Sequence, residues 1–261
     1  MFTRFTIPVL IPSVFAFAVL MASTAPLAKD IRIGVEGAYP PFSAKTADGE
    51  LFGFDIDIAW ALCEEMGATC ELVEQDWDGM IPGLLARKYD AIIASMSITE
   101  ERKKRVDFSE KYYQTPARFV AKKGTALTDN AAALAGKRIG VQRGTIHQCY
   151  LEKAFPDAQP VLYPTQEEVF SDLLIGRIDA QLSDSIVALD GFLNTDEGKD
   201  FDFMGGNHID VECHGEGVGV AVRKQDQDLR DSFSAAINTI RTNGVYQEIN
   251  AKYFDFNIYG D

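Results

Sequence analysis

Several polar residues that stand near predicted strand ends could bind a small ligand that carries one negatively and one positively charged group. Arg102 lies in the first turn of a helix that Thr99 is expected to cap, and its planar guanidinium can bind a carboxylate through two parallel hydrogen bonds. Ser95 and Ser97 follow a strand, where a hydroxyl and a backbone carbonyl can accept hydrogen bonds from an ammonium group. Asp184 ends another strand and could pair with a cation, cap the next helix, or do both. These residue types predict a charged binding site.

Two further acids could set the preference for a ligand side chain. Glu36 follows the first predicted strand, and Asp55 opens the first predicted helix. Asp55 also has a structural interpretation, because an acid in the first turn suits the helix dipole. If both carboxylates face one pocket, they favour a ligand with a long cationic side chain, since a buried charge needs a partner.

The chain lacks the residue patterns of common enzymes and metal sites. It contains no Ser/His/Asp set, HExxH motif, P-loop, CxxC pair, or GxGxxG at a strand–helix turn. His208 and His214 flank Cys213, but the chain has three histidines in all and no metal-ligand spacing. We therefore interpret both as solvated loop residues and expect no cofactor, no metal and no catalytic residue.

Composition and charge exclude other classes. Of the 261 residues, 46% are hydrophobic and 25% are charged, which is typical of a globular protein. With 39 acidic and 25 basic residues, the formal net charge is −14. Such a chain repels phosphate backbones, so a nucleic-acid partner is not expected.

The N-terminus has the pattern of an export signal. Arg4 precedes an apolar run from Ile7 to Met21, which small residues follow. The run is shorter than the roughly 20 apolar residues of a membrane span and contains two prolines. We therefore predict a signal peptide over residues 1–28 and an exported protein.

Four cysteines are an even number, as expected for disulfides in an oxidising compartment. Cys63 and Cys70 are seven residues apart, and we favour a bridge between them. Cys149 and Cys213 could form a second bridge or remain buried thiols, and the sequence leaves this choice open.

Strands and helices alternate along the chain, which predicts α/β architecture with parallel sheets. Strands are expected at 31–35, 70–73, 91–94, 136–141, 161–163 and 178–182, and helices at 54–66, 80–87, from 100, and at 147–155, 165–175, 229–241 and 245–253.

The alternation falls into two series, which we interpret as two lobes. The extended segments 119–122 and 217–222 would cross between them, so that the second lobe is inserted into the first. The predicted lobe 1 comprises 29–116 and 217–261, and lobe 2 comprises 117–216. A single doubly wound domain is the alternative, because periodicity alone does not separate the two.

Motifs in register along the mature chain carry a resemblance to a known family. They are Tyr39–Phe42, Gly53–Ala59, Asp90–Ile92, Ser97–Arg102, Asp107–Ser109, Gly136–Val141, Gly176–Ala180 and Tyr253–Gly260. The chain resembles the periplasmic substrate-binding proteins of amino-acid ABC transporters, and most of all their lysine/arginine/ornithine-binding and histidine-binding branch. The resemblance implies the type II periplasmic binding fold, with two lobes of mainly parallel sheets flanked by helices and joined by two hinge strands. It also implies the Cys63–Cys70 disulfide.

The resemblance further implies a monomer in the periplasm that closes on one amino acid and delivers it to a membrane permease. Arg102 and the backbone at 144–147 would hold the α-carboxylate, and Asp184 would pair with the α-ammonium. Tyr39 and Trp77 match an aromatic pair around the ligand stem. The implied binding residues are Glu36, Tyr39, Asp55, Trp77, Ala94, Ser95, Ser97, Arg102, Thr145, Ile146, His147 and Asp184.

Two residues depart from the family pattern. Ala94 stands where relatives often carry serine, and His147 stands where they carry glutamine. We expect a cationic amino acid, namely arginine, lysine or ornithine, with histidine or an arginine-derived opine as alternatives. An exported dehydratase acting on cyclohexadienyl acids is the rival enzyme, with Glu36 or Asp55 as general acid. A sensor or chemoreceptor is an alternative partner to the permease.

Overall fold

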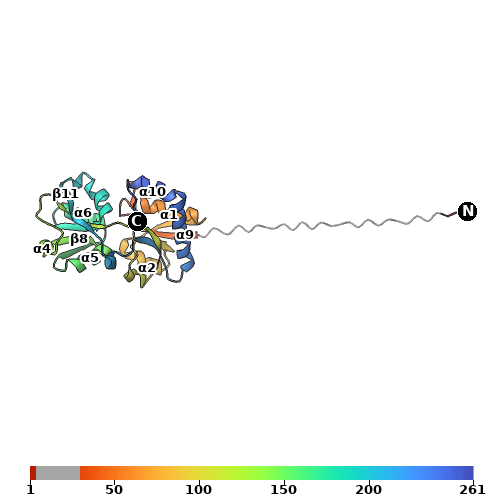
Figure 1. Ribbon diagram of the computed structural model, residues 1–261, viewed down its shortest axis with the longest axis horizontal. Coiled ribbons are helices and arrows are strands. Elements are labelled where there is room, and N and C mark those ends of the chain that lie inside the picture. The colour runs from red at the N-terminus through yellow and green to blue at the C-terminus, as the bar shows by residue number, and fades with distance from the viewer. Residues whose placement is uncertain (4–29, 261) are drawn as a thin grey trace.

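Two β-sheets, each flanked by helices, form two lobes that lie side by side (Figure 1). The structure is a computed structural model that describes residues 1–3 and 30–260. The predicted signal peptide lies almost wholly in 4–29, outside the described residues. In the described part of the chain, no helix combines the length and apolar character that a membrane crossing needs.

The first sheet has the strand order β4-β1-β5-β12-β6. Its strands are β1 (Asp30–Val35), β4 (Thr69–Glu74), β5 (Ala91–Ile92), β6 (Asp107–Tyr113) and β12 (Val218–Val222). The strands β4, β1 and β5 are parallel, whereas β12 runs antiparallel to both of its neighbours. The other elements of this lobe are β2 (Ala44–Lys45), β3 (Leu51–Phe52), α1 (Phe54–Glu65), the 3-10 turn η1 (Trp77–Gly79), α2 (Met80–Leu85), α3 (Glu100–Lys103), α9 (Gln227–Asn243) and α10 (Val245–Tyr253).

The second sheet repeats this plan with the order β11-β7-β10-β8-β9. Its strands are β7 (Ala117–Lys122), β8 (Arg138–Gln142), β9 (Gln159–Tyr163), β10 (Ala180–Asp184) and β11 (Phe201–His208). Here β9, β8 and β10 are parallel, and β7 is antiparallel to β10 and β11. The remaining elements are α4 (Ala131–Leu134), α5 (Ile146–Ala154), α6 (Gln166–Leu174), α7 (Ser185–Ala188), η2 (Leu189–Leu193), η3 (Glu197–Asp200) and α8 (Val211–His214). The expected α/β class with parallel strands and flanking helices is thus confirmed.

The chain passes between the lobes twice, at 114–116 and at 215–217. The two passages are adjacent, because Val218 pairs with Tyr113 and forms a bridge with Ser97. The C-terminal segment also touches this region, where Gln114 N donates to Ile258 O at 3.1 Å.

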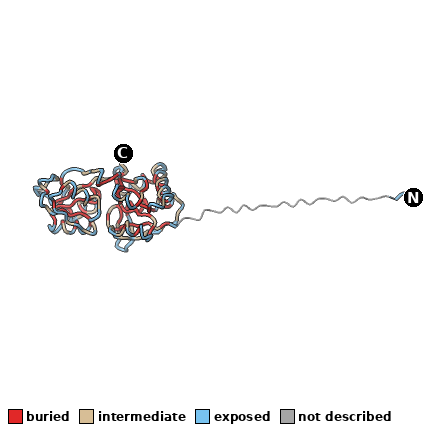
Figure 2. Tube along the Cα trace, turned by 90° about the horizontal axis from the view of Figure 1, so that it is seen from below, coloured by how far each residue is buried: buried red, intermediate tan, exposed pale blue. Residues whose placement is uncertain are grey.

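Apolar packing holds the two layers of each lobe together. Figure 2 shows buried backbone concentrated in the interior of both lobes. Phe54 at the start of α1 is fully buried against Phe42 and Tyr113, with ring centroids 6.1 and 5.9 Å away. The preceding Gly53 has φ +132°, and a Cβ there would lie 2.3 Å from Phe42 O. Only glycine therefore allows the chain to enter α1 this close to its neighbour.

Most predicted elements exist with slightly different ends. The strand expected at 91–94 is shorter, because Ser95 adopts a left-handed conformation (φ +53°) and the ladder ends at Ile92. The helix expected from 100 is a single turn. No strand was expected at β6 or β11. β11 contains Gly205 and Gly206, which interrupt the alternation that a strand prediction needs.

Both cysteine pairs are disulfides. Cys63 and Cys70 connect α1 to β4, with Cα atoms 6.2 Å apart, which confirms the predicted bridge. Cys149 and Cys213 connect α5 to α8, with Cα atoms 5.6 Å apart, although 64 residues separate them in sequence. Cys149 and Cys213, for which the sequence allowed either a bridge or two buried thiols, thus form a bridge.

Candidate functional site

A cavity lies between the lobes, at the carboxyl ends of β1, β8 and β10. Both lobes and both connecting segments contribute to its wall. Ligands in α/β folds commonly bind outside the carboxyl ends of strands. All predicted binding residues except Asp55 line this cavity: Glu36, Tyr39, Trp77, Ala94, Ser95, Ser97, Arg102, Thr145, Ile146, His147 and Asp184.

Arg102 provides a cation without a carboxylate partner among the described residues. Its Nη1 donates to Ser97 O at 2.9 Å, and its Nη2 approaches Gly144 O of the other lobe at 3.4 Å. Thr99 caps the helical turn by accepting from Arg102 N at 3.3 Å. Burial lowers the pKa of the Arg102 guanidinium to about 10, so it remains charged at neutral pH. The remaining N–H groups are available to an anionic ligand group.

The N-terminus of α5 faces the same part of the cavity from lobe 2. Thr145 caps this helix by accepting from Gln148 N at 3.4 Å, and its own hydroxyl donates to Gln142 O at 2.6 Å. Ile146 and His147 form the first turn, where backbone N–H groups have no partner within the helix. The helix dipole adds a favourable field for an anion. We refer to Arg102 together with Thr145–His147 as the carboxylate end of the cavity.

Asp184 caps a helix, which is one of the two roles considered for it in the sequence. Its Oδ1 accepts from Ile186 N at 2.8 Å and from Val187 N at 3.4 Å, which caps α7. Its Oδ2 accepts from the hydroxyl of Thr115, which lies in the first connecting segment. Burial raises the pKa of Asp184 to about 6. A ligand ammonium would supply the positive charge that this buried carboxylate lacks.

Asp55 lies behind the cavity wall and does not form part of it. It is 0% exposed, and its Oδ2 accepts from Ser95 N at 2.6 Å and from Ser95 Oγ at 2.9 Å. Its Oδ1 accepts from the hydroxyl of Tyr112 at 3.0 Å. The expectation that Asp55 meets the ligand side chain is therefore wrong. Because Ser95 donates its hydroxyl proton to Asp55, the lone pairs of Ser95 Oγ remain free to accept from a ligand.

Glu36 and Gln142 also line the cavity, and we call this part of its wall the acidic end. Glu36 is 7% exposed, and its Oε1 accepts from Gln142 Nε2 at 2.7 Å across the lobes. Burial raises the pKa of Glu36 to about 7, and the negative charges of Asp76, Asp78 and Asp55 add to this shift. A cation at this end would stabilise the ionised form of Glu36.

Two aromatic residues also line the cavity. Tyr39 is buried and packs against Phe42, with ring centroids 6.2 Å apart. Trp77 lies 5.2 Å from Arg102 Cζ, measured to the ring centroid, which is within cation–π range. A Cβ added at Gly144 would lie 3.6 Å from Trp77 Nε1, so Trp77 contacts the loop of lobe 2.

Several lining residues were not predicted from the sequence. They include Gln142, Thr115 and His214. Gln142 directly follows a predicted strand end, the same signal that identified Glu36, and could have been found by it. Thr115 and His214 carry no such signal. Thr115 lies in the first passage between the lobes, and His214 ends α8, which a disulfide joins to α5.

The interpretation of His208 and His214 as solvated loop residues is wrong. His208 lies in β11, with Nδ1 3.0 Å from the hydroxyl of Tyr150. His214 ends α8 and is 5% exposed. Even so, no group of three or more potential metal ligands occurs among residues 1–3 and 30–260.

Comparison with known proteins supplies the family. Residues 31–256 match the model of the bacterial extracellular solute-binding proteins, family 3. An L-arginine-binding protein of Pseudomonas aeruginosa is 51% identical over 94% of this chain and 95% of its own length. The lysine/arginine/ornithine-binding periplasmic protein of Escherichia coli is 41% identical over 92% of this chain and 93% of its own length.

A solved structure agrees with the sequence relatives. It is a Salmonella typhimurium periplasmic binding protein described as having high arginine specificity, and it is 34% identical with a TM-score of 0.81. The match covers 87% of this chain and 100% of the other. These relatives are binding proteins, and the resemblance seen in the sequence motifs is confirmed. This chain belongs to family 3 of the bacterial extracellular solute-binding proteins.

Proposed function

We propose that this protein captures a cationic L-amino acid, namely arginine, lysine or ornithine, in the periplasm by closing its lobes. It then delivers the ligand to an ABC permease. The observation that carries the proposal is that the wall of one cavity holds a cation and a buried acid. Among the described residues Arg102 has no carboxylate partner, while the carboxyl group of Glu36 is buried near other acids in the wall of the same cavity. An extended amino acid with a terminal cation complements both ends.

Contacts between the lobes support the closing step. Gln142 of lobe 2 donates to Glu36 of lobe 1, and the exposed pair Arg143 and Asp78 spans the same gap. We retain 29–116 with 217–261 as lobe 1 and 117–216 as lobe 2. Bound ligand would add contacts to both lobes, so closure and binding are coupled.

The relatives favour this ligand class. The P. aeruginosa relative is named for L-arginine and the E. coli relative for lysine, arginine and ornithine. Histidine and arginine-derived opines are retained as alternative ligands, because His147 and Ala94 depart from the family pattern at the cavity wall.

Calorimetric titration of the mature protein tests the proposal. The protein is unfolded and refolded first, so that any carried-over ligand is removed. Arginine, lysine, ornithine, histidine and an opine are then compared with citrulline, which has nearly the shape of arginine without its positive charge. We expect one-to-one binding that is tight only for the cationic side chains. Equal affinity for citrulline and arginine would contradict the role of Glu36.

The enzyme and sensor alternatives need separate measurements. Incubation with prephenate or arogenate followed by mass spectrometry should give no product, because the protein is proposed to bind and not to convert its ligand. Product formation would establish the dehydratase. Co-purification of the ligand-loaded protein with its permease tests the transport role against delivery to a chemoreceptor.

A further inference from the structure

The protonation state of His214 follows from one hydrogen bond. Its Nδ1 accepts from the backbone N–H of Asp210 at 2.9 Å, so that nitrogen carries no proton. Burial lowers the pKa of His214, which keeps the ring neutral near pH 7. In a neutral imidazole with an unprotonated Nδ1, the proton is on Nε2. His214 therefore presents one N–H donor from Nε2.

This donor is buried and has no partner among the described residues. His214 is 5% exposed, and its Nε2 makes no hydrogen bond there. The residue nevertheless forms part of the wall of the cavity between the lobes. A buried N–H group without a hydrogen-bond partner is destabilising, so such a group is expected to meet a polar partner in its working state.

His214 lies at the carboxylate end of the cavity. Its ring centroid is 6.1 Å from that of His147 in the first turn of α5. Burial lowers the pKa of His147, and the positive charge of Arg102 adds to this shift. The next residue, Gly215, packs on Ile98, since a Cβ there would lie 2.0 Å from Ile98 O.

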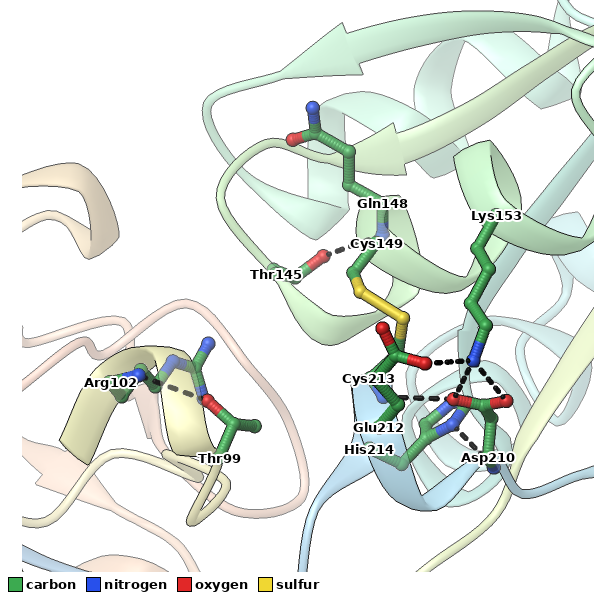
Figure 3. The surroundings of a disulfide bond; sticks show 10 residues. All are labelled: Thr99, Arg102, Thr145, Gln148, Cys149, Lys153, Asp210, Glu212, Cys213 and His214. Carbon is green, nitrogen blue, oxygen red and sulfur yellow. Dashed lines mark hydrogen bonds and ion pairs between the residues drawn. A yellow bond between two sulfur atoms is a disulfide. The ribbon is translucent and has the colours of Figure 1, made fainter. Parts of the chain in front are cut away.

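Covalent and ionic contacts hold α8 in this position. The neighbouring Cys213 is bonded to Cys149 of α5, and Cys213 N donates to Asp210 at 2.9 Å. Lys153 of α5 forms an ion pair with the same Asp210 at 2.9 Å. Figure 3 shows this cluster on one side and Arg102 with Thr99 on the other. The donor is therefore fixed relative to the helix N-terminus that lines the carboxylate end.

We propose that His214 is a further ligand-binding residue, whose Nε2–H donates a hydrogen bond to the α-carboxylate of the bound amino acid. This inference rests on the proposed function. Arg102 and α5 supply charge and dipole, and His214 at the end of α8 adds a neutral donor. A neutral donor avoids placing a second buried cation beside Arg102.

Two substitutions separate ligand binding from structural support. The side-chain oxygen of asparagine can replace the Nδ1 acceptor for Asp210 N–H, but His214→Asn loses the Nε2 donor. His214→Gln places an amide donor near the position of Nε2 and gives up the acceptor. We expect His214→Asn to bind arginine about 10- to 100-fold more weakly, as for a lost hydrogen bond to a charged group. His214→Gln should stay within about fivefold of wild type.

A matched control and a direct readout complete the test. His208→Asn alters a histidine that does not line the cavity and should bind arginine like wild type. Because the chain has three histidines, imidazole nitrogen NMR can resolve each of them. The Nε2–H signal of His214 should persist and shift when arginine binds.

The outcomes are distinct. Wild-type affinity in His214→Asn would overturn the role of His214, as would equal losses in the Asn and Gln variants or an Nε2–H signal unchanged by arginine. If wild type itself binds no amino acid, the proposed function fails and the role of His214 fails with it.

Discussion

The carboxylate end and the acidic end of the cavity carry opposite charges that respond differently to their surroundings. Burial lowers the pKa of Arg102 only to about 10, so its charge is permanent near pH 7. Burial and neighbouring acids raise the pKa of Glu36 to about 7, so its charge depends on pH and on the ligand. The permanent charge suits a group that every amino acid shares, whereas the adjustable one suits the variable side chain.

The largest expected effect comes from removing the permanent charge. Arg102→Ala should weaken binding of every amino acid by about 1,000-fold, because a ligand carboxylate would then be buried without a partner. Calorimetry with arginine and citrulline measures this loss, which should be similar for both ligands. Arg177→Ala is the matched control, since Arg177 is exposed, pairs with Asp172 within lobe 2 and lies outside the cavity wall. If Arg102→Ala weakened the binding of arginine but not of citrulline, Arg102 would not bind the carboxylate that both ligands share, and the comparison between the two ends would be wrong.

Removing the acid at the ammonium position should have the next largest effect. Asp184→Asn can retain the helix cap, because asparagine caps as well as aspartate, but it removes the negative charge. We expect about 100-fold weaker binding of both arginine and citrulline, measured by calorimetry, with little change in thermal stability. Similar affinities in the variant and wild type would mean that Asp184 serves α7 alone.

Substitution at the acidic end should change preference more than overall affinity. In Glu36→Gln the side-chain oxygen can still accept from Gln142, but the charge is lost. Arginine binding should weaken by about 30-fold, whereas citrulline binding should change little. Parallel titrations of both ligands measure the ratio. Equal losses for the two ligands would place the ligand cation away from Glu36.

The smallest expected effect is that of pH on the wild-type protein. Glu36 must be ionised to pair with a cation, and below its pKa of about 7 the proton competes with the ligand. Arginine affinity should therefore fall by up to about tenfold between pH 8 and pH 6, while citrulline affinity changes less. Titration across this range measures the slope, and Glu36→Gln should flatten it. Below pH 6 protonation of Asp184 should weaken both ligands.

Local sequence patterns predicted the site residues whose positions are set by residues next to them in the chain. Arg102 was identifiable because a capping threonine and a strand end precede it within a few residues. Glu36 was identifiable as the residue after a regular strand. In both cases the geometry is set by neighbours in sequence, and the structure places both residues at the cavity.

Longer-range effects explain what the sequence did not show. Asp55 lies behind the cavity wall because it accepts a hydrogen bond from Ser95 N. Hydrophobic periodicity does not predict the left-handed backbone of Ser95. His214 depends on a disulfide between residues 64 positions apart. The short strand β5 and the glycine-interrupted β11 are held by their sheet neighbours rather than by local preference.

The insertion of one lobe into the other also determines the order in which the sheets can be completed during synthesis. The strand β12 pairs with both β5 and β6, yet it is translated after the whole of lobe 2. The strands of the second sheet all lie within 117–208, so that sheet can form while β5 and β6 still lack their shared partner. A chain that ends after residue 208 would contain one complete sheet and one sheet in which β5 and β6 each have an unpaired edge. These unpaired edges would be the part of that chain most prone to aggregation.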